Sequence, residues 1–124
     1  MKKLSIELTG NTTRFEPGSQ LEGTAQWNLD YQPDSIELRL VWNTSGQGDL
    51  DISIVDVITY EQPPLRDERT FGFTLPLEPY SFSGEMISLI WAVELIVFPS
   101  DDSTRTEIVI APNASEIVLP KCNS

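Results

Sequence analysis

Few side chains in this sequence could take part in bond-making chemistry. The chain contains no histidine, so it lacks the side chain that most often acts as a general base near neutral pH and that commonly binds zinc. Lys121 and Cys122 stand side by side, but they belong to a segment, 121–124, that we expect to be a flexible tail. A nucleophile pair would require this tail to fold back. We therefore expect a protein that is not an enzyme.

Two pairs of carboxylates offer the hard oxygen atoms that calcium prefers. Asp49 and Asp51 flank a leucine, and Asp101 and Asp102 lie between two serines. Neither pair has the spacing of a calcium-binding loop, and Asp is common in turns because its side chain bonds to the nearby backbone. We expect these to be turn residues and expect no metal or other cofactor. The alternative is a small-ligand or calcium-binding module that uses the acidic loops.

The overall charge limits the classes of partner. The chain has 8 Lys and Arg against 19 Asp and Glu, a formal net charge of −11, and a field of this sign repels nucleic acid and anionic lipid head groups. The most apolar segment, 86–98, contains Ser88 and Glu94 and is shorter than the ~20 residues that span a membrane. Segment 4–9 alternates and does not resemble a signal peptide. We expect a cytoplasmic protein.

Alternation of apolar and polar residues predicts strands and no long helix. In 21–29 every odd-numbered residue is apolar or small and every even-numbered residue is polar. Further strands are predicted at 4–9, 36–42, 50–61, 71–75, 86–98, 104–111 and 116–119. Pro63 and Pro64 end one of them, and we expect a charged loop at 66–69. About 7–8 short strands are typical of an all-β, two-sheet antiparallel β-sandwich of the immunoglobulin-like kind, here a single domain over 1–120.

Two predicted strands are apolar on both faces. In 86–98 one parity suits a core, yet apolar residues also occupy the other parity. In 50–61 two valines oppose the main apolar set, so either a bulge re-aims the strand or both faces are covered. A strand with one solvated face would not show this pattern. We expect the extra apolar residues to form a protein interface, and the alternative is that loops of the same chain cover them. These residues are Val55, Val57, Ile90, Ala92, Ile96 and Phe98.

Three segments carry a family resemblance. In order they are 15–23 (FEPGSQLEG), 71–76 (FGFTLP) and 78–84 (EPYSFSG), the last followed by 90–93 (IWAV). Together they resemble the aromatic-x-Pro-Gly, Phe-x-Phe and Pro-x-Ser-Phe-x-Gly elements of arrestin-like domains. The resemblance extends over most of 4–111 and implies a sandwich similar to the amino-terminal domain of these proteins, in a single-domain version.

The same residues have a local physical interpretation. Proline presets φ at one turn position and glycine suits the next one, while a glycine within a strand lets another backbone or a Trp ring approach. We therefore expect 15–23 to be a corner that begins a strand. The residues expected to serve as structural turn and motif positions are Pro17, Gly18, Gly23, Pro79, Ser81, Phe82 and Gly84.

The resemblance also implies a class of function. Arrestin-like proteins usually act as scaffolds or cargo adaptors, and their relatives include bacterial sporulation-control proteins. The expected function is a non-catalytic interaction module whose partners are proteins, a second copy of this chain among them, bound through an apolar face or an unpaired sheet edge. Receptor-type arrestins sense phosphate with basic residues on their first strand. Here Lys2 and Lys3 are the only candidates, so recognition of phosphoproteins is not expected.

Overall fold

A computed structural model describes residues 3–46, 51–84, 86–114 and 117–118. These residues form strands and two short 3-10 turns, with no α-helix among them. In chain order the elements are β1 (Lys3–Leu8), η1 (Thr9–Asn11), β2 (Arg14–Phe15), β3 (Gln20–Asn28), β4 (Ser35–Gly46), β5 (Ile52–Glu61), β6 (Arg66–Thr74), β7 (Phe82–Ser83), β8 (Ile87–Phe98), β9 (Ser103–Ile110), η2 (Pro112–Ala114) and β10 (Ile117–Val118). The all-β prediction is confirmed.

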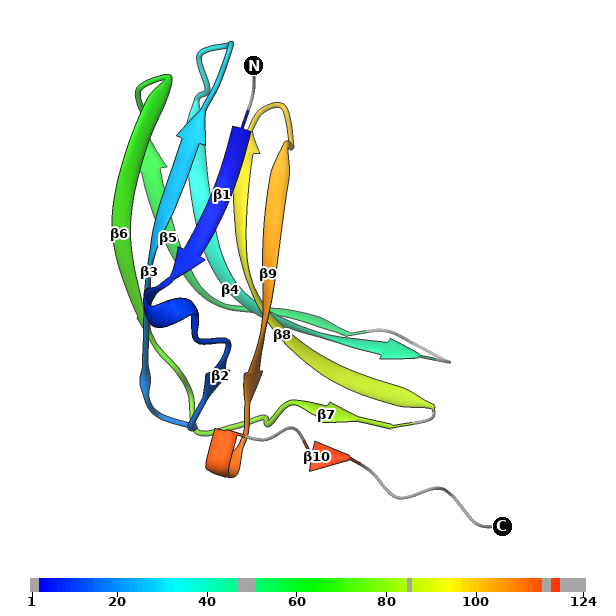
Figure 1. Cartoon of the computed structure of the whole chain (residues 1–124). Coiled ribbons are helices and arrows are strands. Elements are labelled where there is room, and N and C mark those ends of the chain that lie inside the picture. The colour runs from blue at the N-terminus through cyan, green and yellow to red at the C-terminus, as the bar shows by residue number, and fades with distance from the viewer. Residues whose placement is uncertain (1–2, 47–50, 85, 115–116, 119–124) are drawn as a thin grey trace.

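The strands form two facing sheets (Figure 1). The small sheet has the order β1-β3-β6, and the large sheet has the order β10-β7-β8-β4-β5, with β9 also paired to β8. All the long strands pair antiparallel, whereas the short pairs β2–β9 and β10–β7 are parallel. The predicted two-sheet sandwich is therefore present. In Figure 1 parts of β4, β5 and β8 continue beyond the small sheet, toward β7 and β10.

The core lies between the two sheets and is built from alternate residues of their strands. Leu21, Ala25 and Trp27 of β3 face residues of β4 and β8 within one buried cluster. The indole N–H of Trp27 donates to the Pro64 carbonyl at 2.9 Å, and that of Trp91 donates to the Pro79 carbonyl at 2.9 Å, as a buried indole requires. Trp42 is only partly buried and packs against the margin of this cluster.

The charged segment 66–69, expected to be a loop, is instead the first half of β6, where Arg66 lies opposite Asn28 and Arg69 opposite Ala25. The prediction was wrong because β6 is an edge strand, and charged side chains are compatible with an edge that borders water. Arg69 Nε lies 2.6 Å from Asp67 Oδ2. Hydrogen bonds from the Arg69 side chain and the Glu68 backbone lower the pKa of Asp67.

The segment with which the family resemblance begins forms a tight corner. The Ser19 N–H donates to the Glu16 carbonyl at 3.2 Å, and Gly18 between them has φ +80°. Proline followed by a glycine with positive φ is the pattern of a type II turn. The Leu75 N–H then donates to the Ser19 carbonyl at 2.9 Å, so the corner aligns the start of β3 with the end of β6.

Gly23 is required by close packing within the small sheet. A Cβ atom at this position would lie 2.5 Å from the Glu7 carbonyl oxygen and 2.9 Å from Cζ of Phe71. The expected close approach to a backbone is therefore present, and the aromatic ring that joins it is Phe71 and not a tryptophan. Gly72 on β6 is the contrasting case, because the nearest atoms to a Cβ there are 3.8 Å away.

We predict that Gly23→Ala lowers the free energy of unfolding by about 1–3 kcal/mol, the usual cost of forcing extra volume into a packed site. Urea denaturation followed by tryptophan fluorescence measures it. Gly72→Ala is the matched control, since it removes a strand glycine without a clash, and we expect little change or a small gain in stability. Equal losses in the two variants would contradict the packing explanation.

Candidate protein-binding surface

The outer face of the large sheet carries the residues predicted to form an interface. Along β4, Leu38 and Leu40 belong to the core, so Arg39 and Val41 face outward. The strand register places Val57 opposite Arg39 and Ala92 opposite Val41. Three predicted residues of β8 share this outward parity and are partly buried, whereas Ala92 is fully buried. They are Ile90, Ile96 and Phe98.

Charged side chains of the same sheet cover part of this face. The guanidinium carbon of Arg39 lies 5.6 Å from the centre of the Phe98 ring, and Arg39 Nη2 lies 3.1 Å from Glu37 Oε1. Ile96 lies between Glu37 on β4 and Ser103 on β9. The apolar residues of β8 are thus interleaved with ionic and polar groups and do not form a continuous apolar patch.

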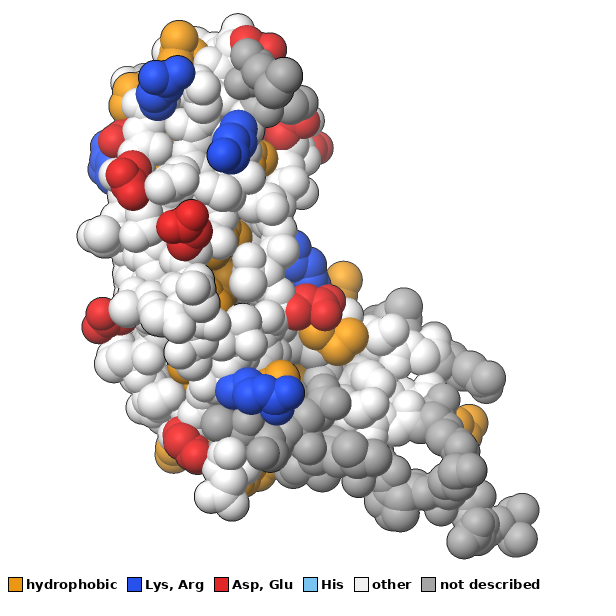
Figure 2. Space-filling model, in the orientation of Figure 1, with side chains coloured by type: hydrophobic (Ala, Val, Ile, Leu, Met, Phe, Trp, Pro, Cys, Tyr) orange, Lys and Arg blue, Asp and Glu red, His pale blue; other side chains and the backbone are white. Residues whose placement is uncertain are grey.

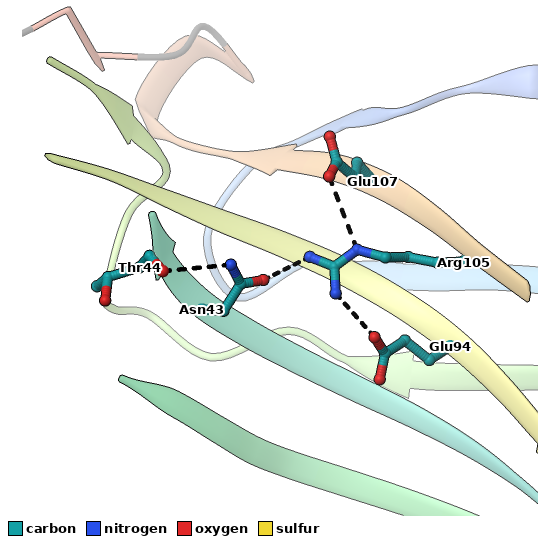
Figure 3. A network of polar contacts seen from close by, with 5 residues as sticks. All are labelled: Asn43, Thr44, Glu94, Arg105 and Glu107. Carbon is teal, nitrogen blue, oxygen red and sulfur yellow. Dashed lines mark hydrogen bonds and ion pairs between the residues drawn. The ribbon is translucent and has the colours of Figure 1, made fainter. Parts of the chain in front are cut away.

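A second network of polar side chains bridges three strands (Figure 3). Arg105 on β9 donates from Nη1 to Glu94 Oε2 on β8 at 2.7 Å and from Nη2 to the Asn43 side-chain oxygen on β4. Its Nε lies 3.7 Å from Glu107 Oε2, and Asn43 Nδ2 donates to the Thr44 carbonyl at 3.4 Å. This network occupies the middle of the outer face, and the more exposed apolar side chains lie to one side of it, on β5.

A β-bulge determines which residues of β5 reach the outer face. Leu40 pairs with Asp56 and the next residue, Val41, pairs with Ile54, so Val55 has no counterpart on β4. Of the two alternatives left open by the sequence, the bulge is observed. It moves Ile54 into the row of outward residues that includes Val57, and it moves Ile52 opposite Asn43.

Ile52 and Ile54 were missed by the sequence pattern, which groups them with the core-facing Ile58 and Tyr60. The signal that could have revealed them is Asp56, because a carboxylate within an inward row indicates a change of parity. The exposed fraction is 77% for Ile52 and 50% for Ile54, against 41% for Val55 and 40% for Val57. These four residues are named the β5 apolar row.

The β5 apolar row lies on a free sheet edge. β5 ends the strand order of the large sheet, and among the described strands it pairs with β4 alone. Its other side therefore presents backbone N–H and C=O groups that a further strand could bind.

Figure 2 shows that on the face drawn there, Lys and Arg side chains are scattered among Asp and Glu and form no basic patch.

The remaining predicted motif residues have structural contacts. Ser81 is buried, its N–H donates to the Ile110 carbonyl at 2.7 Å, and its hydroxyl accepts from the Ile110 N–H at 3.0 Å. Phe82 pairs with Leu89 of β8, and the Gly84 N–H donates to the Ser88 hydroxyl at 3.5 Å. With Pro79, which accepts the Trp91 indole N–H, they join the segment before β8 to the core and to the end of β9.

Of the two carboxylate pairs considered as calcium ligands, the structure describes Asp51, Asp101 and Asp102. Asp102 accepts a hydrogen bond from the Tyr31 hydroxyl, and the backbones of Asp101 and Asp102 bond to Val97 in the turn between β8 and β9. The Asp51 N–H donates to the Thr44 hydroxyl at 2.8 Å. Asp49, Lys121 and Cys122 lie outside the described residues. Among the described residues no three His, Cys, Asp or Glu side chains are grouped to hold a metal ion.

Comparisons with known proteins support the fold. No protein-family model matches the chain, and no curated protein matches its sequence. The crystal structure of Spo0M, a sporulation control protein from Bacillus subtilis, is similar, with a TM-score of 0.60 and 19% sequence identity. The match covers 88% of this chain and 49% of Spo0M, so the chain spans about half the length of that protein. At this identity the likeness is one of fold, and it supports an arrestin-like domain at the structural level.

In the part of the chain that the structure describes, no helix has the length and apolar character needed to cross a membrane.

We predict that calcium at millimolar concentration leaves the melting temperature of the protein unchanged. A ligand bound only by the native state must raise that temperature, and the Asp102 carboxylate already accepts the Tyr31 hydroxyl. Thermal unfolding followed by circular dichroism, with magnesium as the ionic-strength control, measures it. A calcium-specific rise that disappears in Asp102→Asn would instead favour the ligand-binding alternative.

Tyr60 makes the inner side of β5 sensitive to high pH. Its ring centre lies 5.5 Å from that of Trp27, and its hydroxyl oxygen is buried without a hydrogen-bond partner among the described residues. Burial raises the pKa of Tyr60, while the positive charge of Arg69, 5.4 Å from the ring centre, acts in the opposite direction.

A folded-state pKa above the unfolded value, about 10 for tyrosine, means that the folded protein holds the proton more tightly. The corresponding stability is fully present below pH ~10 and is lost as the pH rises through the folded pKa. We predict that Tyr60→Phe loses less stability above pH ~10 than the parent, and that at pH 7 it is at least as stable because no hydrogen bond is broken. Urea unfolding across pH 7–11 measures this, with the exposed Tyr80→Phe as control.

Proposed function

We propose that this chain is a non-catalytic interaction module that binds other proteins through the outer face of its large sheet, centred on β5. The single observation that carries the proposal is the β5 apolar row: four large apolar side chains, at least 40% exposed, on a strand that ends its sheet. Exposed apolar groups that form a continuous row are typical of binding surfaces.

The energetics favour β5 over the neighbouring strands. Burying a Val or Ile side chain fully contributes roughly 1.5–3 kcal/mol, and these four side chains are still largely or partly in water. The residues of β8 have less to gain, because Ala92 is already fully buried and Phe98 is partly covered by Arg39. The interface predicted from the sequence is thus proposed to have its centre at Val55 and Val57, extended by Ile52 and Ile54.

The fold is compatible with this function. The similar structure belongs to a protein named for the control of sporulation, and an arrestin-like sandwich suits an adaptor or scaffold. We also propose that the protein acts in the cytoplasm and that a second copy of this chain is one of its candidate partners. Fold likeness does not select the partner; the surface does.

We predict that Ile54→Glu and Val57→Glu, each made alone, reduce protein binding at least tenfold without lowering the melting temperature appreciably. The side chains are exposed, so the substitutions remove apolar contact and add a charge at the interface without opening a core cavity. Affinity capture from native lysate, quantified by mass spectrometry, and sedimentation at several protein concentrations measure hetero- and self-association respectively.

Thr70→Glu is the matched control, because Thr70 is an exposed residue of β6 in the other sheet. It adds the same charge and should behave like the parent protein. If parent, control and both β5 variants capture the same proteins in the same amounts and all sediment as monomers, the proposed function is wrong.

A further inference from the structure

β5 is an edge strand of the large sheet and β6 is an edge strand of the small sheet. The two edges are protected against further strand pairing to different degrees. The β6 edge carries charged residues throughout its first half, and Asp67 and Arg69 lie opposite core residues Trp27 and Ala25, with which they share a face. Inward-pointing charges of this kind prevent another strand from pairing. The stretch of β5 from Ile52 to Val57 contains no Lys, Arg or Pro. Its protection is limited to the bulge and to one acidic residue, Asp56, which lies opposite the core residue Leu40.

The bulge limits but does not abolish pairing along β5. At the bulge the Asp56 side chain accepts a hydrogen bond from the Val57 N–H at 2.9 Å, which satisfies one backbone group locally. Beyond it, the pairing with β4 is regular from Asp56 to Glu61 and again from Ile52 to Ile54. An added strand could follow β5 on either side of the bulge, using the backbone groups that its free edge presents.

The side chains of β5 impose a pattern on any strand that binds there. Ile52, Ile54 and Val57 line the outer face, whereas Asp56 lies opposite Leu40 and therefore on the other face. The charged residues of this strand, Asp56 and Glu61, and Asp51 just before it, are all acidic. A neighbouring strand would gain from apolar residues beside Ile52, Ile54 and Val57 on the outer face and from a positive charge beside Asp56 on the other face.

A second copy of the chain fits this pattern poorly. The β5 strand of a second copy offers no Lys or Arg to Asp56. In the antiparallel self-pairing centred on Asp56, this residue lies opposite its own copy and Asp51 lies opposite Glu61, and like charges directly opposite one another are destabilising. The net charge of −11 on each copy adds a repulsion between the two molecules. Charge complementarity thus favours a partner of the opposite sign.

We propose that the occupant of the β5 edge is an extended segment of another protein in which apolar residues alternate with Lys or Arg. The segment adds to the large sheet as a further strand next to β5. Its apolar residues contact the β5 apolar row, and a basic residue lies beside Asp56. This inference rests on the proposed function and names the partner class for the same surface.

The test uses a fluorescent peptide that alternates Lys and Val over about nine residues, a length within the usual range for a strand. Its binding to the full chain is followed by fluorescence anisotropy. We expect the Lys–Val peptide to bind at least tenfold more tightly than two matched peptides: one with Glu in place of Lys, and one with Lys and Val retained but with alternate backbone nitrogens methylated, which removes the edge hydrogen bonds and keeps the charge.

Variants locate the binding site. Asp56→Asn preserves an acceptor for the Val57 N–H and removes the charge, so we expect several-fold weaker peptide binding at an unchanged melting temperature. Ile54→Lys should abolish binding, whereas Thr70→Lys, on the other sheet, should weaken it only slightly through the change in net charge. Amide hydrogen exchange should slow in 56–61 when the peptide binds, and not in β6.

Two results would overturn the inference. Equal binding of the methylated and unmethylated peptides would show attraction by charge without strand addition. A concentration-dependent dimer that Ile54→Glu dissociates would identify a second copy as the occupant, and that result would leave the proposed function standing. Failure of the proposed function is distinct, since it requires that the β5 variants change neither protein capture nor sedimentation.

Discussion

The antiparallel pairing of β4 with β8 is the interaction on which the rest of the structure depends. It runs without interruption from Ser35 opposite Phe98 to Gly46 opposite Ile87, and because side chains alternate along a strand, it decides at every position which face is the core. Leu38, Leu40, Val93 and Leu95 face the small sheet and are fully buried. Their neighbours along the chain are consequently directed to the outer face, whatever their polarity.

This ladder is longer than the sheet that covers it. β4 and β8 are 12 residues each, against 6 for β1 and 9 for β3 and β6, and parts of them project beyond the small sheet (Figure 1). The uncovered region cannot bury apolar groups between the two sheets. The partial burial of Trp42, which lies near that end of β4 and packs against the margin of the core, follows from this mismatch.

Much of the fold follows from local sequence, because alternation is a local property. The strands at 21–29 and 36–42 could be predicted for this reason, and the Pro17-Gly18 corner because its turn type depends on two adjacent residues. The edge position of β6 could not be predicted, since it depends on which strands become neighbours, and without that knowledge segment 66–69 looks like a loop. The residues of the proposed surface could be predicted only in part. The outward position of Val57 follows from its parity, whereas that of Ile52 and Ile54 depends on a bulge at Val55, which Asp56 only hints at in the sequence and which the register with β4 establishes.

The acidity of the chain and its exposed apolar edge have a common physical explanation in this structure. An apolar edge strand without protecting charges would normally bind copies of itself or aggregate. Here the acidic residues along β5 and the net charge of −11 oppose association between like molecules while leaving the backbone edge accessible. The protection is therefore selective: it acts against chains of the same charge and lowers the barrier for basic ones. On this view the bulge and the carboxylate of Asp56 are parts of the binding surface, and the exposed isoleucines beside them are not defects of packing.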